Sequence, residues 1–331
     1  MELDLLEALP RPQDPATAPR GAAKPVADDL ACLRTGIVNV FLYGQPGAGD
    51  RGWVLVDAGL PGSAGRIARA AAERFGAGAR PAAIVLTHGH FDHVGALREL
   101  AEAWDTPVFA HPLELPYLTG RSAYPPPDPT VGGGAMALLS WAYPRRPVDL
   151  GKRVRPLPAD GSVPGMPEWR WIASPGHTPG HVSLFRGADR TLLAGDAVIT
   201  VKQESAFAVL TQRPAVHGPP AYFTMDWDAS RRSVRELASL EPWTLATGHG
   251  VPMRGPAMLE ALRFLARNFD GIAVPHHGRY VGQPALADER GVQYVPPPPP
   301  DARNALLLAL GGAFVAGLAA AALTARRRRG E

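Results

Sequence analysis

Short apolar runs alternate with amphipathic stretches along most of this chain. Apolar runs rich in β-branched residues predict strands, and they cover Gly36–Tyr43, Trp53–Asp57, Ala82–Thr87, Pro107–Ala110, Trp169–Ala173, His181–Phe185 and Thr191–Ala194. Stretches with apolar residues three or four positions apart predict helices, and they cover Ser63–Phe75, Val94–Ala103, Ala135–Ala142, Asp226–Leu240 and Pro256–Asn268. This alternation indicates an α/β domain, which we place at residues 31–270.

The pattern changes at both ends of the chain. Residues 1–30 are rich in Pro, Ala and charge, which predicts a flexible arm without a signal peptide. Residues 271–304 end in a run of prolines and are predicted as a Pro-rich linker. Two insertions with Pro, Gly and aromatic residues, 114–168 and 201–225, are either pocket walls or surface loops.

An uncharged apolar segment follows the linker. It runs for 20 residues from Ala305 to Thr324, long enough to span the roughly 30 Å core of a bilayer as a helix. We predict a transmembrane helix over 305–325 and a basic tail over 326–331, with a buried helix as the alternative. The arginines of the tail favour an enzyme outside the cytoplasm, whereas the missing signal peptide favours the cytoplasmic side, which we prefer. Ala313 and Gly317 would let two such helices meet in a homodimer.

Composition narrows the function only slightly. The chain has 331 residues and a formal net charge of +3, partly from the terminal arginines, so no nucleic-acid partner is expected. Its single cysteine, Cys32, excludes an internal disulfide and is interpreted as a packing residue.

Candidate metal ligands are concentrated just after one predicted strand. The sequence Thr-His-Gly-His-Phe-Asp-His-Val-Gly places His88, His90, Asp92 and His93 within six positions. In an extended segment His88, His90 and Asp92 point the same way, and His93 falls on the neighbouring side. Such a density of ligands suits two metal ions held side by side.

Three later segments each add one ligand at the end of a predicted strand. His177 lies in Ser-Pro-Gly-His-Thr-Pro-Gly-His, Asp196 ends Thr-Leu-Leu-Ala-Gly-Asp, and His249 lies in Leu-Ala-Thr-Gly-His-Gly. A glycine beside each one lets the backbone approach a crowded site closely. Other histidines, at positions 111, 181, 217, 276 and 277, are interpreted as structural, supporting or surface residues.

The combined motifs resemble those of the metallo-β-lactamase fold superfamily, over about Cys32 to Phe269. The resemblance implies an αββα sandwich of two packed mixed sheets with outer helices. It implies a first metal held by His88, His90 and His177, a second held by Asp92, His93 and His249, and Asp196 as the bridge between them. It also implies that Asp57, in Val-Leu-Val-Asp-Ala-Gly, supports the metal loop without binding metal.

The ligand set predicts metal-assisted hydrolysis of a small-molecule substrate. Two divalent ions would share a hydroxide that is available at roughly pH 7, and Asp92 would orient the water and shuttle its proton. Zinc suits the ligands best, and iron and manganese are alternatives. No G-x-S-x-G nucleophile motif is present.

The stretch around His177 resembles the glyoxalase II-like and lactonase-like branches of the superfamily, which predicts a thioester, lactone or other ester-like substrate. A phosphodiesterase or nuclease-like hydrolase is the rival enzyme, and an iron persulfide dioxygenase is less favoured because the second set of ligands is complete. A membrane-tethered metal-binding sensor without turnover is the alternative from a different class.

Overall fold

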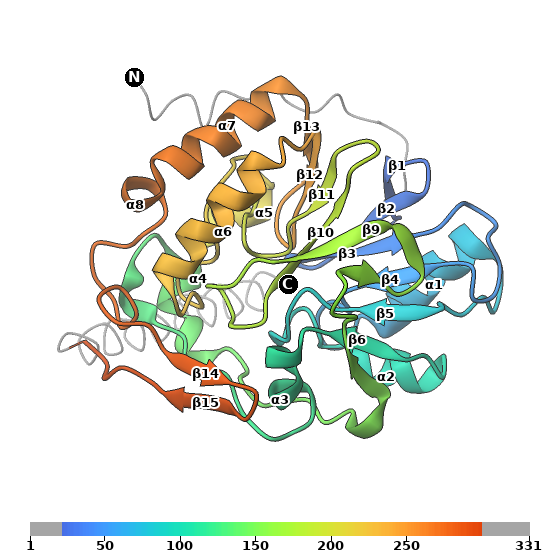
Figure 1. Cartoon of the computed structure of the whole chain (residues 1–331), viewed down its shortest axis with the longest axis horizontal. Coiled ribbons are helices and arrows are strands. Elements are labelled where there is room, and N and C mark those ends of the chain that lie inside the picture. Colours follow the sequence, from blue (N-terminus) through green and yellow to red (C-terminus); the bar gives the residue numbers. More distant parts are fainter. Residues whose placement is uncertain (1–21, 300–331) are drawn as a thin grey trace, which may run out of the picture.

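The computed structural model describes residues 22–299 of the chain. Two mixed β-sheets lie face to face in the middle of the molecule (Figure 1). The first sheet holds, in spatial order, β1 (Lys24–Ala27), β2 (Leu30–Thr35), β3 (Val38–Tyr43), β4 (Val54–Val56), β5 (Ala83–Val85), β6 (Val108–Ala110) and β7 (Val154–Pro156). The second sheet holds, in spatial order, β13 (Met253–Arg254), β12 (Thr244–Ala246), β11 (Thr191–Leu193), β10 (Val182–Arg186), β9 (Met166–Ala173) and β8 (Ser162–Val163).

Helices cover the outer face of each sheet (Figure 1). Helices α1 (Ala64–Phe75) and α2 (Leu97–Ala103) lie on the first sheet, and α6 (Trp227–Ser239) and α7 (Pro256–Arg267) lie on the second. The shorter helices are α3 (Leu115–Leu118), α4 (Ala135–Leu138), α5 (Ala206–Thr211) and α8 (Phe269–Ile272). The predicted αββα sandwich is therefore confirmed.

Three apolar layers hold the sandwich together. Ile67 and Phe75 of α1 pack on the first sheet, and Leu237 of α6 packs on the second. Between the sheets, Phe41 and Trp169 belong to a core whose members come from both. Burying apolar area on both faces explains why central strands such as β4 and β5 are continuously apolar in sequence.

Strand direction brings the ligand segments to one edge of the sandwich. β4, β5 and β6 run parallel to one another, and so do β11 and β12. The loops that follow β4, β5, β11 and β12 carry Asp57, the four ligands of the sequence motif, Asp196 and His249 respectively. The carboxyl ends of parallel strands gather at the same edge of a sheet, where α/β proteins place their sites.

Several predicted boundaries are wrong. The flexible arm predicted for residues 1–30 is not correct over Lys24–Ala27, which forms β1 and pairs antiparallel with β2. Its pattern of one buried and two exposed positions is that of an edge strand, which the polar composition concealed. The helix predicted to begin at Val94 begins at Leu97, because Val94 still belongs to a turn in which its N–H donates to the carbonyl of His90.

The linker predicted for residues 271–304 is also wrong in part. Strands β14 (Leu286–Asp288) and β15 (Gly291–Tyr294) form a hairpin within it. The segment is tied to the first insertion, since Tyr280 donates its hydroxyl hydrogen to the carbonyl of Pro126 and the N–H of Val292 donates to Ser122. The segment before the prolines thus packs on the domain.

The membrane location predicted from the sequence is corrected. Among residues 22–299 no helix is long and apolar enough to cross a bilayer. Helix α6, with 13 residues, falls well short of the roughly 20 that a span requires. The helix predicted over 305–325 and the tail over 326–331 lie outside the described residues, and the membrane anchor is not retained.

Candidate metal centre

All seven predicted ligands meet in one buried cluster. The motif loop after β5 supplies four of them, and the loops after β9, β11 and β12 supply one each. Every residue of the cluster is at most 6% exposed. The members are His88, His90, Asp92, His93, His177, Asp196 and His249.

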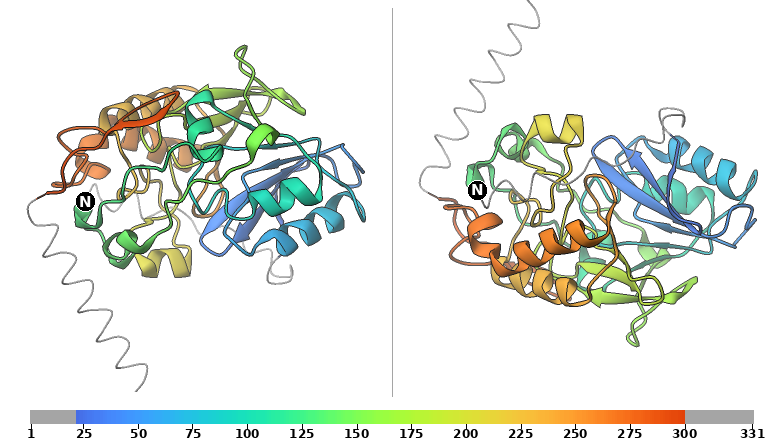
Figure 2. Two further views of the ribbon diagram at one scale, coloured as in Figure 1. Left: turned by 90° about the horizontal axis from the view of Figure 1, so that it is seen from below. Right: turned by 90° about the horizontal axis from the view of Figure 1, so that it is seen from above.

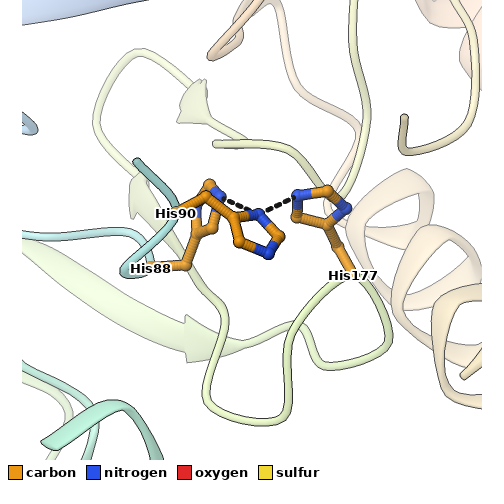
Figure 3. A group of neighbouring side chains, drawn as sticks. All are labelled: His88, His90 and His177. Carbon is orange, nitrogen blue, oxygen red and sulfur yellow. Dashed lines mark hydrogen bonds between the residues drawn. The ribbon is translucent and has the colours of Figure 1, made fainter. Parts of the chain in front are cut away.

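Three histidines form the first ligand group, and their rings converge on one point (Figure 3). Nε2 of His88 lies 3.1 Å from Nδ1 of His90, and that Nδ1 lies 2.9 Å from Nε2 of His177. These nitrogens lie within 4.8 Å of one another, which is a spacing that one cation can bridge.

The second ligand group is made of Asp92, His93 and His249. Each offers one ligand atom within 4.8 Å of the others, and Nε2 of His249 lies 3.4 Å from Oδ2 of Asp92. Sequence neighbours therefore serve different groups, because the chain turns between His90 and His93, where the N–H of His93 donates to the carbonyl of His90.

Asp196 lies between the two groups. Its Oδ2 is 3.1 Å from Nε2 of His249 and 3.5 Å from Nε2 of His177, whereas its Oδ1 is 3.5 Å from Nε2 of His93. Asp196 Oδ1 and His93 Nε2 are buried without a hydrogen-bond partner. Unpaired buried polar atoms are costly, and a cation between such lone pairs would satisfy both. The residues present thus fit a metal site.

Burial sets the charge of the first group. It lowers the pKa values of His88 and His177 well below the usual range and that of His90 to about 3, and the neighbouring histidines lower them further. All three rings are therefore neutral near pH 7, which is the form of imidazole that binds metal.

The second group and Asp196 carry charge. Burial opposes the charged forms, but Asp196 raises the pKa of His249, and Asp196 with Asp57 raises that of His93 well above its usual range. His249 and His93 in turn hold the pKa of Asp196 well below its usual range despite burial. Burial raises the pKa of Asp92.

Asp57 orients His93, in line with the supporting role that the family resemblance implied. Its Oδ2 accepts from Nδ1 of His93 at 2.8 Å and from the hydroxyl of Thr87 at 2.8 Å, and its Oδ1 accepts from the N–H of Thr87. With Nδ1 occupied in this way, Nε2 of His93 faces the cluster. His249 is oriented likewise, because its Nδ1 lies 2.7 Å from the carbonyl of Ile37.

His181 supports the loop that carries Asp196. Its Nε2 accepts from the N–H of Asp196 at 2.9 Å, and its Nδ1 lies 2.8 Å from the hydroxyl of Ser174. Burial lowers the pKa of His181 to about 3, which keeps Nε2 free to accept. The other histidines stay outside the cluster: His111 and His217 are half-buried, and His276 and His277 are exposed.

Glu114 is a site residue that the sequence did not reveal. Its carboxylate is fully buried and accepts from Gly89 and Tyr124 through Oε2, and from Thr178 and Gly180 through Oε1. The surrounding Pro-Leu-Glu-Leu gave no signal, because an acidic residue at the start of a helix is ordinarily a surface residue.

The glycines beside the ligands have a steric reason. A Cβ at Gly248 would lie 2.0 Å from Oδ1 of Asp196 and 2.7 Å from the ring of His93. No side chain fits there without displacing the cluster, so the close approach expected from the sequence is present at this position.

Both insertions reach the cluster with aromatic rings. The ring of Phe223 stacks on His90 with centroids 4.5 Å apart, and Tyr124 lies 4.5 Å from His90 on another side. Tyr143 and Tyr222 pack next to Phe223. The insertions therefore form walls around the first ligand group.

Known proteins match this chain over most of its length. The model of the metallo-beta-lactamase superfamily matches residues 33–249. The probable metallo-hydrolase YflN of Bacillus subtilis (strain 168) is 49% identical over 262 residues, which cover 79% of this chain and 99% of that protein.

Solved structures show the same fold. The metallo-beta-lactamase family protein TTHA1429 of Thermus thermophilus has a TM-score of 0.52 with 23% identity, over 75% of this chain and 81% of that one. A beta-lactamase domain protein of Burkholderia ambifaria has a TM-score of 0.53 with 21% identity, over 78% and 76%. With its His/Asp cluster at the edge of an αββα sandwich, this chain belongs to the metallo-β-lactamase superfamily and is a metallohydrolase of that fold.

Proposed function

We propose that this metallohydrolase works with two divalent cations. His88, His90 and His177 would hold the first cation, Asp92, His93 and His249 the second, and Asp196 would bind both. The observation that carries the proposal is the position of Asp196, whose Oδ2 lies 3.5 Å from Nε2 of His177 in the first group and 3.1 Å from Nε2 of His249 in the second. A single-metal site would leave one of these groups without a function.

The side chains divide the work of hydrolysis. Two bound cations would lower the pKa of a bound water toward neutrality and polarise the substrate carbonyl. Asp92 lies at the border of the second group, where it would orient the attacking water and take up its proton. Burial raises the pKa of its carboxyl above the usual value, which is the direction that helps a carboxylate take up a proton.

The donor set favours zinc. Five histidines and two carboxylates are typical zinc ligands, although the same atoms accept iron or manganese. The two oxygen ligands, Asp92 and Asp196, are the part of the set that suits the harder ions. Metal analysis of the purified protein would identify the ions directly.

The surroundings of the cluster favour a thioester, lactone or other ester-like small molecule. Outside the ligands, the rings of Tyr124 and Phe223 contact His90, and they offer apolar surface and no positive charge. The ion pairs of Asp92 and Asp196 are with histidines. An uncharged ester-like group suits this apolar surface better than a phosphodiester, which carries a negative charge of its own.

The test combines metal analysis with turnover. The full chain is purified, its metal content is measured by mass spectrometry, and hydrolysis is measured on matched thioester, lactone, phosphodiester and β-lactam substrates. We expect two metals per chain and turnover of a thioester or lactone. The exposed His276 gives a control, and His276→Ala should change neither value.

Other outcomes contradict the proposal in different ways. Turnover of the phosphodiester alone would replace the substrate class and keep the metal site. One metal per chain would remove the bridging role of Asp196. Two metals without turnover of any substrate would support a metal-binding sensor instead of a hydrolase.

A further inference from the structure

Three aromatic side chains beside the first ligand group form what we call the aromatic wall: Phe91, Tyr143 and Phe223. Their ring centroids lie 5.8 Å (Phe91 to Tyr143), 5.9 Å (Tyr143 to Phe223) and 6.3 Å (Phe91 to Phe223) apart. All three residues are only partly buried. The rings thus support one another and still present apolar surface to the outside.

The aromatic wall is joined directly to the ligands. Phe223 stacks on His90 at an interplanar angle of 29°, and Phe91 lies between His90 and Asp92 in the sequence. The hydroxyl of Tyr143 already donates to the carbonyl of Met136. The wall is left with ring faces to offer to a substrate.

Glu204 fixes the wall by joining the two insertions. Its carbonyl accepts from the N–H of Met136 at 3.1 Å, and its Oε1 accepts from the N–H of Ala221 at 2.8 Å. The first bond holds the segment that leads to Tyr143, and the second holds the segment that leads to Phe223. The wall is therefore preorganised without a ligand.

Exposed apolar side chains, which we call the rim, lie on the two segments that Glu204 joins. Helices α4 and α5 lie side by side in both views of Figure 2. Around them Leu139 is 39% exposed, Trp141 42%, Phe207 68% and Leu210 80%. Exposed large apolar residues of this kind can supply a binding surface for an apolar group.

We infer that the aromatic wall and its rim bind the apolar acyl group of the substrate, so that the chain prefers medium-length acyl thioesters to acetyl thioesters. The inference rests on the proposed function. Each methylene that leaves water for such a surface contributes about fourfold in binding. We therefore expect kcat/KM to rise at least about tenfold from an acetyl to a hexanoyl thioester.

The experiment measures kcat/KM for acetyl, butyryl and hexanoyl thioesters of one thiol. Phe223→Ala and Tyr143→Ala should remove most of the rise with chain length, and Phe223→Leu should retain part of it because the side chain stays apolar. Trp243→Ala is the matched control, since Trp243 is 45% exposed and precedes β12, whereas His249 follows the other end of that strand, so this variant should keep the full rise. Comparing lengths within one variant corrects for any loss of folded protein.

The outcomes separate this inference from the proposed function. Turnover of all three thioesters with no dependence on chain length overturns the aromatic wall as a binding surface and leaves the hydrolase intact. An unchanged rise in both alanine variants does the same. No turnover of any thioester in protein with two metals removes the proposed substrate class, and the inference with it.

A second observation is independent of the aromatic wall and concerns Glu114. Its Oε2 accepts from the N–H of Gly89 at 3.0 Å, and Gly89 separates two ligands of the first group. Its Oε1 accepts from the hydroxyl of Thr178 at 2.9 Å and from the N–H of Gly180 at 2.8 Å, in the loop that carries His177. One carboxylate thus joins the two loops that build the first ligand group.

We propose that Glu114 is a positioning residue for the first metal. The proposal relies on the ligand assignment given above. Glutamine is matched in size but presents an N–H₂ group to one pair of donors, so Glu114→Gln should loosen one loop. Such loss of outer support typically lowers metal affinity about 10- to 100-fold. Tyr124→Phe, which removes one donor and keeps the ring, should have a smaller effect in the same direction.

Cobalt titration of metal-free protein tests this role, with the visible absorption of bound Co²⁺ as the readout. In Glu114→Gln one of two equivalents should weaken, and its spectrum should change, while the other equivalent stays as in the wild type. Glu260→Gln, on the exposed side of α7, is the control and should leave both equivalents unchanged. Two unchanged equivalents with a lower Tm, or equal weakening of both, would overturn the assignment.

Discussion

The two ligand groups share one loop, yet they differ in charge. The first consists of three histidines whose pKa values are lowered by burial and by one another. In the second, Asp196 raises the pKa values of His93 and His249. The first group therefore offers free lone pairs near pH 7, whereas the second must release protons to bind a cation. Asp196 is where the two kinds of group meet.

Replacing Asp196 by Ala should have the largest effect, because it should impair metal binding by both ligand groups and so remove the difference between them. Both groups lose a shared ligand, and His93 and His249 lose the carboxylate that balances them. We expect less than one tightly bound metal per chain and a loss of kcat/KM of at least about a thousandfold. Metal analysis with thioester turnover checks this, and two metals in the variant would contradict it.

Replacing Asp92 by Asn should damage the second group and spare the first. The amide keeps the volume but cannot accept a proton, and it is a poor metal ligand. A loss of kcat of about 10²- to 10⁴-fold is expected, with the first metal retained. Full activity, or loss of the first metal, would contradict the division into two groups.

Replacing Asp57 by Asn should weaken the second group more mildly. The amide N–H₂ would compete with Nδ1 of His93 as a donor, so the ring would lose its fixed orientation. We expect metal affinity to fall about 10- to 100-fold at the second site alone. Cobalt titration distinguishes this from Glu114→Gln, which should affect the opposite site.

The smallest expected effect concerns His181, a buried histidine that binds no metal in our assignment. It can be compared with the histidines of the two ligand groups through the pH dependence of stability. Its folded pKa is about 3, so below about pH 6.5 the unfolded chain takes up a proton that the folded chain refuses. The free energy of unfolding should therefore decrease as the pH is lowered, by about 1.4 kcal/mol per pH unit for this residue, until the folded form is protonated too.

Urea unfolding of metal-free protein between about pH 4.5 and 6.5 checks this. In His181→Gln the slope of unfolding free energy against pH should be shallower by about one proton. Exposed His277 provides the control, because His277→Gln should keep the wild-type slope. An unchanged slope in His181→Gln would show that His181 is protonated in the folded protein.

Local patterns predicted the longer helices and several central strands. Apolar runs placed β3, β4, β5, β6, β10 and β11, and apolar periodicity placed α1, α6 and α7 within a few residues. The edge strand β1 and the hairpin β14–β15 were not predicted, since their polar, short and partly exposed segments owe their structure to partners elsewhere in the chain. The helix predicted over Ala135–Ala142 divides at Leu139 into α4 and a 3₁₀ turn for the same reason.

The sequence alone determined which residues bind metal in our assignment, because ligands packed into strand-to-loop junctions identify themselves by residue type and spacing. Only the tertiary structure decided which of them face one another, that Asp196 lies between two groups, and that Glu114 and the aromatic wall belong to the site. The physical reason is distance along the chain. A carboxylate that joins Gly89 to Gly180, or a ring from residue 223 stacked on residue 90, has no local pattern, since only the closed fold brings those segments together.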